Sequence, residues 1–341
     1  MFRPLSLYLC AVMAINLFCT TAANATAPKT QLETKEVDLF NQALNRPTKL
    51  KLWYQTDNTQ CHTKVCLASQ QELDRVAVIS HGAFGSPREM NWLGYALASQ
   101  GWVVVGVAHY GESWVYGPEK IDPSSAGRFW QRPQDVSFAI DSLETEQLFD
   151  KPLQTNRVIM LGHSAGGFTS LAMSGASLEA GKSESYCATA ASQTDKGCYY
   201  RRGNKQPSKS NKQLAQIGLL QAQMKDPRIA AVIALDPALG HAVSEQSLKR
   251  ILVPTLVIGA VENDFLPFNA HAQYYADHIP KAELVGIADR AGHFVFIDAC
   301  DSDRAVFGVP LCKDRDGVER SSIQKAVLGH VFRFIYQNGL G

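Results

Sequence analysis

The chain has 341 residues, of which 45% are hydrophobic and 19% are charged, and 33 basic residues balance 32 acidic ones to a formal net charge of +1. This length is enough to bury a sizeable core, and α/β folds of this size often form one domain. The balanced charge gives no reason to expect nucleic acid or an anionic surface as a partner.

The first segment is expected to be removed before folding. Met1–Arg3 is a short basic start, Leu5–Cys19 is almost wholly apolar, and Ala23-Asn24-Ala25 matches the small-residue cleavage pattern. We therefore predict a signal peptide over residues 1–25 and an exported protein, periplasmic or secreted. No later apolar run approaches the roughly 18 residues of a membrane span, so residues 26–341 are expected to form a single domain without stable membrane insertion.

The remaining cysteines come in local pairs. Two of the eight cysteines lie in the predicted signal peptide, which leaves six. Export permits disulfides, and short separations favour the nearest pairings. We predict three disulfides: Cys61–Cys66, Cys187–Cys198 and Cys300–Cys312. No metal site is expected, because these pairs lack C-x-x-C spacing and accompanying histidines.

The first third of the chain alternates strands with helical patterns. Two strands joined as a hairpin are expected at Glu36–Phe40 and Leu50–Tyr54. The apolar runs Arg75–Ser80 and Trp102–Val107 indicate strands buried on both faces. Between these runs, helical spacing is kept by Met90, Leu93 and Leu97.

Residues 109–133 lack a clear period but are rich in aromatic residues, namely Trp114, Tyr116, Phe129 and Trp130. Two interpretations stay open: an irregular loop with buried anchors, or an aromatic wall over an apolar pocket. A helix is expected next, over Gln134–Leu148.

The alternation continues to the end of the chain with one interruption. Further strands are expected at Ile229–Leu235, Pro254–Gly259 and Glu283–Ile287, and helices at Asn269–His278 and Ser321–Tyr336. The segment at about 181–226 departs from this rhythm and is expected to be an insertion or partial lid. The whole pattern predicts an α/β fold with a mostly parallel central sheet and helices on both faces.

One motif carries chemistry. Gly162-His163-Ser164-Ala165-Gly166 follows an apolar run and precedes a helical pattern, which is the context of a G-x-S-x-G nucleophile elbow. The glycines let strand and helix pass closely around a strained serine. Ser164 is therefore the predicted nucleophile.

A serine nucleophile needs a general base, which in this kind of site follows it in the chain. His293 lies in a loop after the last predicted strand, where it can reach the end of the sheet, and is the predicted base. The other later histidines are less suitable. His271 and His278 are expected on a helix surface, His330 lies within the terminal helix, and His241 precedes the strand that carries the favoured acid.

The acid that orients the base has three candidates. Asp264 follows the strand directly before the one that leads to His293, and is the predicted acid. Asp236 ends the preceding strand and is the main alternative, and Glu262 is a third candidate.

The developing oxyanion requires two amide donors. One is expected to be the amide of Ala165, directly after the nucleophile. The other is expected to be the amide of Ala83, in the loop after the strand that ends at Ser80. His81 in the same loop is expected to be a structural hydrogen-bonding residue.

With these residues in place, the chain over about 36–338 resembles the serine α/β-hydrolases, in particular the proteins grouped as predicted dienelactone hydrolases and the platelet-activating-factor acetylhydrolases. Ser80-His81-Gly82 is similar to their oxyanion segment, and Gly162–Gly167 to their elbow. Glu262-Asn263-Asp264 resembles a segment of bacterial cutinase-like polyester hydrolases, whose acid falls on Asp264, whereas the acetylhydrolases place theirs on Asp236. True dienelactone hydrolases use a cysteine nucleophile, and the small polyester hydrolases have no counterpart to residues 181–226.

The sequence therefore predicts a serine hydrolase that cleaves carboxylic esters through an acyl-enzyme. Its substrate is expected to be a small-molecule or lipid ester, and no cofactor, metal or nucleic acid is expected. A thioesterase, an acyltransferase or a phospholipid acetylhydrolase would use the same triad. The non-enzyme alternative is a binding protein with an inactive hydrolase fold.

Overall fold

The computed structural model describes residues 30–57, 64–145, 148–202, 218, 220–221, 223–288 and 290–341. The predicted signal peptide, Cys61 of the first cysteine pair and most of residues 203–222 in the expected insertion lie outside the described residues.

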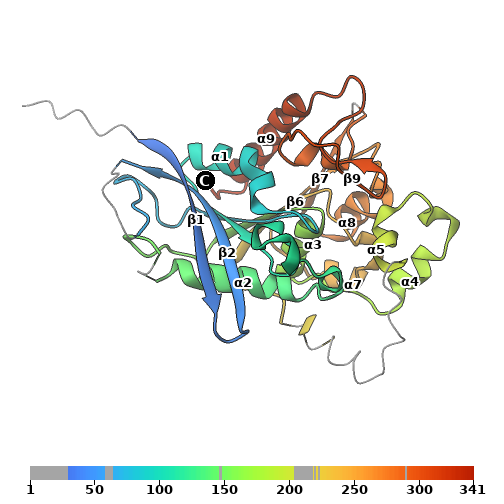
Figure 1. The fold of residues 1–341 in the computed structure, drawn as a ribbon, viewed down its shortest axis with the longest axis horizontal. Helices are drawn as coiled ribbons and strands as arrows, with labels where there is room; N and C mark the ends of the chain where they lie inside the picture. The colour runs from blue at the N-terminus through green and yellow to red at the C-terminus, as the bar shows by residue number, and fades with distance from the viewer. Residues whose placement is uncertain are drawn as a thin grey trace, which may run out of the picture.

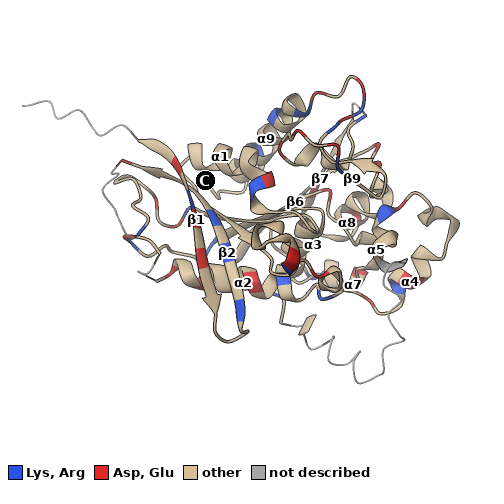
Figure 2. Ribbon diagram, in the orientation of Figure 1, with Lys and Arg blue, Asp and Glu red and all other residues tan. Residues whose placement is uncertain are grey.

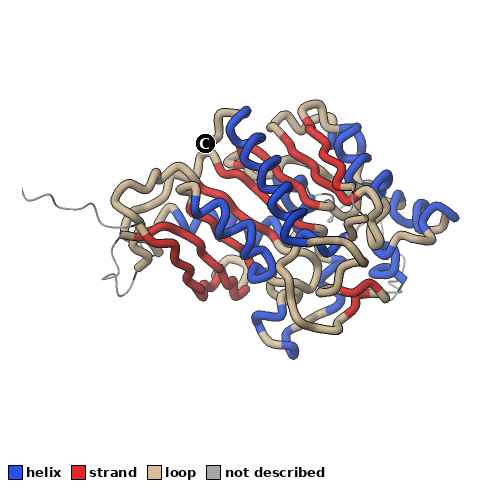
Figure 3. The backbone as a smooth tube through the Cα atoms, turned by 90° about the horizontal axis from the view of Figure 1, so that it is seen from above, coloured by secondary structure: helices blue, strands red, loops and turns tan. Residues whose placement is uncertain are grey.

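Eight described strands form one sheet in the order β1-β2-β4-β3-β5-β6-β7-β8. β2 pairs antiparallel with both β1 and β4, and the remaining neighbours are parallel, so β2 alone runs against the other seven. The expected mostly parallel sheet is confirmed (Figures 1 and 3). The strands are β1 (Gln31–Asn41), β2 (Arg46–Thr56), β3 (Val76–Ser80), β4 (Val103–Ala108), β5 (Val158–His163), β6 (Ile229–Leu235), β7 (Thr255–Ala260) and β8 (Ala282–Ile287), with a separate hairpin of β9 (Ala305–Val306) and β10 (Val309–Pro310).

The connections between strands carry the helices. The α-helices are α1 (Asn91–Ser99), α2 (Gln131–Leu143), α3 (Ala165–Met173), α4 (Lys182–Cys187), α5 (Tyr199–Arg202), α7 (Glu245–Leu248), α8 (Ala272–His278) and α9 (Arg320–Gln337). Short 3-10 turns are η1 (Pro87–Met90), η2 (Trp114–Tyr116), η3 (Pro118–Lys120), η4 (Pro123–Gly127), η5 (Ala190–Ser192), η6 (Lys196–Cys198), η7 (Gly240–Ala242), η8 (Phe268–Ala270) and η9 (His293–Phe296).

Each face of the sheet has its own hydrophobic core, because successive strand residues point to opposite faces. In β3, Val76 and Val78 join the core that also contains residues of α2, α3 and α8. Ala77 and Ile79 join the core that contains residues of α1 and α9. The central strands are therefore buried on both faces, as their continuous apolar runs predicted.

Some boundaries differ from those expected. α2 begins at Gln131 rather than at residue 134, because Pro133 fits the first turn of a helix, where its missing N–H is not needed. It ends at Leu143 rather than at residue 148, and Phe149 beyond it forms a bridge with Val65. β1 begins at Gln31, before the predicted start at residue 36, since it pairs with β2 over its full length.

Two of the predicted disulfides are confirmed, Cys187–Cys198 and Cys300–Cys312. The paired cysteines are separated by 11 and 12 residues in the sequence, so each bond closes a short loop. Within the described part of the chain, no helix is long and apolar enough to cross a membrane. Acidic and basic residues are interspersed over the described elements, in keeping with the balanced net charge (Figure 2).

The approach of α1 to the sheet gives a stability prediction. A Cβ added at Gly94 would lie 2.5 Å from the ring of Trp53, which is fully buried. Gly94→Ala is expected to lower the free energy of unfolding by about 1–3 kcal/mol, as overpacking does. Gly329→Ala in α9 is the matched control, because a Cβ added there meets open space. This variant is expected to gain up to about 1 kcal/mol in helix propensity, with no steric clash to offset the gain. Urea unfolding of both variants measures the difference, and equal effects would contradict the packing argument.

Candidate active site

Ser164 sits on a strained turn between β5 and α3. Its φ of 56° and ψ of −118° are unusual for a residue with a side chain. The packing around it leaves no room for larger neighbours. A Cβ at Gly162 would lie 2.2 Å from the Gly166 carbonyl oxygen, and a Cβ at Gly166 would lie 1.9 Å from the Ser80 carbonyl oxygen. The G-x-S-x-G spacing is thus explained by three backbone segments in direct contact.

The loop after β3 lies directly against this turn. A Cβ at Gly82 would lie 3.5 Å from the Ser164 Cβ. Gly82, Ala83 and Ser164 line the same cavity. Ala165 is the first residue of α3, where amides have no partner within the helix. The two residues expected to supply oxyanion donors therefore both adjoin the turn that carries Ser164.

His293 lies at the start of η9 and is 1% exposed. Its Nδ1 is 3.1 Å from Asp236 Oδ2. Phe265 stacks on the imidazole with ring centroids 5.0 Å apart and an interplanar angle of 11°. The Nε2–H of His163 donates to the His293 carbonyl oxygen over 3.1 Å. His293 is thus fixed at its backbone carbonyl by His163, at one ring face by Phe265 and at Nδ1 by Asp236. It also lines the cavity shared with Ser164.

The carboxylate beside the imidazole is that of Asp236, not that of Asp264, which the sequence favoured. Asp236 follows β6 with a φ of 42°, and its oxygens accept hydrogen bonds from the Ala260 amide (2.8 Å) and from Asn263 Nδ2 (2.6 Å). Asp264 Oδ1 instead accepts from the backbone N–H of His293 over 2.9 Å. The two candidates contact the same histidine at different atoms.

The third candidate acid, Glu262, has an exposed side chain. Its carbonyl oxygen accepts from Arg315 Nη2 (2.9 Å), and the same guanidinium lies 3.4 Å from Asp264 Oδ2. Asp264 is therefore held between Arg315 and the backbone of His293.

Burial controls the charge of the His293–Asp236 pair. It lowers the pKa of His293 to about 3, which the negative charge of Asp264 partly opposes. Burial raises the pKa of Asp236, and hydrogen bonds from Ala260 and Asn263 oppose that rise. The imidazole is therefore uncharged at neutral pH. Because Nδ1 faces Asp236, the proton belongs there and the lone pair of Nε2 is available as a base.

The cavity has a volume of about 460 Å³ and mostly apolar walls. Its aromatic side chains do not come from Trp114, Tyr116, Phe129 or Trp130, the residues considered for an aromatic wall. They come from six positions elsewhere: Phe84, Tyr199, Tyr200, Phe265, Phe294 and Phe307. From the 109–133 segment, the residues lining the cavity are Ile121 and Pro123.

Residues in or next to both disulfide loops contribute to this cavity. Tyr199 and Tyr200 directly follow Cys198, and Phe307 lies in the loop closed by Cys300–Cys312. The amide of Lys196 donates to the Phe265 carbonyl oxygen over 2.8 Å. The segment predicted to be an insertion therefore contacts the residue that stacks on the predicted base.

A second buried cluster joins the insertion to the sheet. Asp195 Oδ2 lies 2.8 Å from His271 Nε2 and 3.6 Å from His241 Nδ1, and Tyr186 stacks on His241 at 4.3 Å between centroids. His271 is 1% exposed, so its expected position on a helix surface was wrong. Its carboxylate partner is contributed by a distant segment, which helix periodicity does not reveal.

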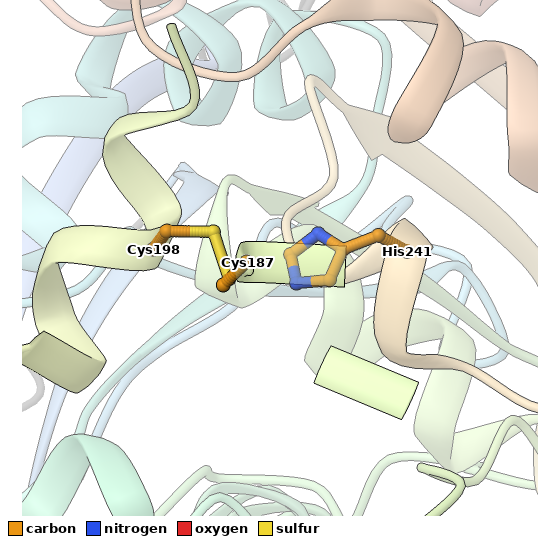
Figure 4. Close-up of side chains that lie close together, drawn as sticks. All are labelled: Cys187, Cys198 and His241. Carbon is orange, nitrogen blue, oxygen red and sulfur yellow. A yellow bond between two sulfur atoms is a disulfide. The ribbon is translucent and has the colours of Figure 1, made fainter. Parts of the chain in front are cut away.

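The ligand chemistry of this cluster does not suit a metal. His271 Nδ1 accepts from the Gly240 amide at 3.3 Å, so the ring proton lies on Nε2, the atom that faces Asp195. Cys187 and Cys198 lie near His241, but their sulfurs are joined as a disulfide and cannot act as thiolate ligands (Figure 4). The cluster is a hydrogen-bonded link between Asp195 and the segments that carry His241 and His271.

Sequence reasoning gave Asn263 no role of its own and missed Phe265. Asn263 Oδ1 also accepts from the amides of Phe265 and Leu266, at 2.9 and 2.8 Å. One side chain therefore fixes the loop that carries Phe265 and also contacts Asp236. Its position between two candidate acids was the only available indication.

The model of the alpha/beta hydrolase family matches residues 77–306 of the chain. A search of curated proteins found no match. Among the solved structures that match is a ferulic acid esterase from Streptomyces cinnamoneus, at 16% sequence identity and a TM-score of 0.49, with 93% of this chain and 92% of that chain covered.

The charge state of His293 can be measured directly. In protein labelled with ¹⁵N-histidine, we expect its ring to remain neutral at about pH 5, below the ordinary histidine pKa of about 6.5, because burial disfavours the cation. The His293 resonance is assigned as the signal that disappears from the spectrum of the His293→Gln variant. A His293 ring that gains its second proton between about pH 6 and 7 would contradict the assignment of a buried, neutral base.

Proposed function

The chain belongs to the alpha/beta hydrolase family, and on this basis we propose that it is a serine hydrolase that cleaves carboxylic esters through an acyl-enzyme on Ser164. The observation that carries the proposal is the shared cavity. The cavity is lined both by Ser164, on its strained turn, and by His293, whose neutral imidazole is hydrogen-bonded to the Asp236 carboxylate. An activated nucleophile needs this pairing of base and orienting acid.

The proposed reaction has two halves. Ser164 Oγ attacks the ester carbonyl as His293 Nε2 takes its proton, and the amides of Ala83 and Ala165 donate to the oxyanion. The imidazolium then protonates the departing alcohol, leaving an acyl group on Ser164. Water, deprotonated by His293, releases the acid and restores the serine.

We assign the role of triad acid to Asp236. Its Oδ2 is the oxygen that faces Nδ1, and it is the more deeply buried of the two candidates. Asp264 is proposed as a positioning residue, since its hydrogen bond to the His293 amide fixes where the η9 turn begins. Its negative charge also raises the pKa of His293 against the effect of burial.

The apolar, aromatic-lined cavity supports an ester with an apolar acyl or alcohol portion as the substrate. Export is also proposed, either to the periplasm or to the exterior. It is supported by the N-terminal cleavage pattern and by the two disulfides, which persist in oxidising compartments.

Covalent labelling tests the nucleophile. The protein incubated with a fluorophosphonate is expected to carry one adduct, on the peptide containing Ser164, and Ser164→Ala is expected to remain unlabelled. Heat-denatured protein is the control for non-specific reaction. Folded wild-type protein without label at Ser164 would overturn the proposed function.

Two variants separate the carboxylates. Asp236→Asn is expected to lower kcat on a p-nitrophenyl ester by about 10⁴-fold, since the imidazole loses its orienting charge. Asp264→Asn keeps an oxygen that can accept from the His293 amide, so its loss is expected to be about tenfold or less.

The pH profile distinguishes the same variants. Because Asp264 raises the pKa of His293, its neutralisation lowers that pKa and moves the acid limb of kcat/KM to lower pH. Losses in the opposite order, large for Asp264→Asn and small for Asp236→Asn, would show that the acid is assigned to the wrong residue.

A further inference from the structure

The peptide bond between Gly82 and Ala83 is fixed by three hydrogen bonds to its carbonyl oxygen. The Gly82 carbonyl oxygen accepts from His81 Nδ1 at 2.6 Å, from Arg132 Nη2 at 3.2 Å and from the Gly85 amide at 3.2 Å. A trans peptide directs its N–H opposite to its C=O. The amide of Ala83 therefore points away from Arg132.

That direction leads to the cavity. Gly82, Ala83 and Ser164 line it, whereas Arg132 is absent from its lining and is buried, with 3% of the residue exposed. Hydrogen bonds to a carbonyl also polarise its amide and make the N–H a stronger donor. The contacts on the Gly82 oxygen thus set both the aim and the strength of the Ala83 donor.

Arg132 is itself firmly fixed. Its Nε and Nη2 lie 3.0 and 2.6 Å from the two carboxylate oxygens of Glu112, and its Nη1 donates to the His81 carbonyl at 2.7 Å. Burial raises the pKa of Glu112, but the charge and hydrogen bonds of Arg132 outweigh it and lower that pKa below its ordinary value. The guanidinium is therefore a permanently charged clamp on two consecutive carbonyls.

The second donor, His81, has a defined tautomer. Its Nε2 accepts from the His109 amide at 3.2 Å, so its proton lies on Nδ1 and points to the Gly82 oxygen. His109 is held in turn by Ser80 Oγ at 2.8 Å and by Asp135 Oδ2 at 3.1 Å. These buried groups lie outside the cavity lining and support the loop.

We propose that Arg132, paired with Glu112, is a positioning residue of the oxyanion hole: it fixes the His81 and Gly82 carbonyls so that the Ala83 amide faces the oxyanion formed on Ser164. The proposal rests on the proposed ester hydrolysis. Arg132 touches no substrate and acts through the peptide that it holds. Its effect therefore falls on the tetrahedral state, where the oxyanion exists, and not on binding of the neutral ester.

Arg132→Lys tests this role, because the three N–H donors of an ammonium cannot replace the four contacts that the guanidinium makes with the two Glu112 oxygens and the two carbonyls. On a p-nitrophenyl ester, kcat is expected to fall by about 10- to 100-fold with KM nearly unchanged, less than the roughly 10²–10³ lost when an oxyanion donor is deleted. Affinity for phenylboronic acid, whose tetrahedral adduct places an oxygen in the same hole, is expected to fall by a similar factor.

Arg228→Lys is the matched control. Arg228 also binds a carboxylate with two nitrogens, on Asp226, but it precedes β6 at the edge of the sheet opposite Ser164. A comparable fall in Tm with unchanged kcat and boronate affinity is expected. If Arg132→Lys lowers Tm alone, or raises KM and leaves boronate affinity unchanged, the proposal is wrong.

A double-mutant cycle covers the remaining possibilities. Ala83→Pro removes the amide donor, so adding Arg132→Lys to it is expected to cause no further loss of kcat; additive losses would overturn the proposal.

If Arg132→Lys does not fold, Glu112→Gln is used in its place, because it weakens the same contact with the Arg132 guanidinium. Fluorophosphonate labelling of Ser164 in wild-type protein separates the two claims. If Ser164 is labelled but Arg132→Lys has no effect on kcat, the proposed hydrolase activity is retained and the role of Arg132 is rejected. If Ser164 is not labelled, both proposals are rejected.

Discussion

The site depends on one close backbone contact, where the first turn of α3 passes the end of β3. Gly166 lies so near the Ser80 carbonyl that a single methyl group could not be inserted, and Gly162 meets the carbonyl of Gly166 in the same way. This contact brings the strained Ser164 beside the loop that carries Ala83. The strain at Ser164 persists because a sheet and a helix, both fully packed, determine the turn from either side.

Buried and partly buried polar groups around this contact form two sets with different functions. On one side, Asp236, Asn263 and Asp264 hold the ring, the loop and the backbone of His293. On the other side, Arg132 and Glu112 hold the carbonyls of the loop after β3. Because an unpaired buried charge is costly, each group constrains its neighbour, and the geometry of the site follows from satisfied pairs.

The fold could be predicted, and the proposed nucleophile and base could be singled out, because their patterns are local. Continuous apolar runs mark strands covered on both faces, and the glycines around Ser164 report a backbone contact that only glycine permits. The choice between Asp236 and Asp264 is not local. Both follow strands, and which one meets the imidazole depends on the positive φ of Asp236 and on Asn263, which turns the intervening loop. His271 was misplaced for a similar reason, since its partner Asp195 belongs to the insertion.

The proposed chemistry and the proposed substrate recognition are carried by different parts of the chain. Ser164, Asp236 and the loop with Ala83 follow directly from β5, β6 and β3, so sheet packing fixes them. The aromatic walls include Tyr199, Tyr200 and Phe307, which lie in or next to loops closed by disulfides. A disulfide restrains a loop without a hydrophobic core of its own. Substitutions in these loops can therefore change the shape of the cavity walls without disturbing the packing of the sheet. The Lys196–Phe265 hydrogen bond is the exception, because it ties the insertion to the ring that stacks on His293. A change in the wall at this point therefore also reaches the proposed base.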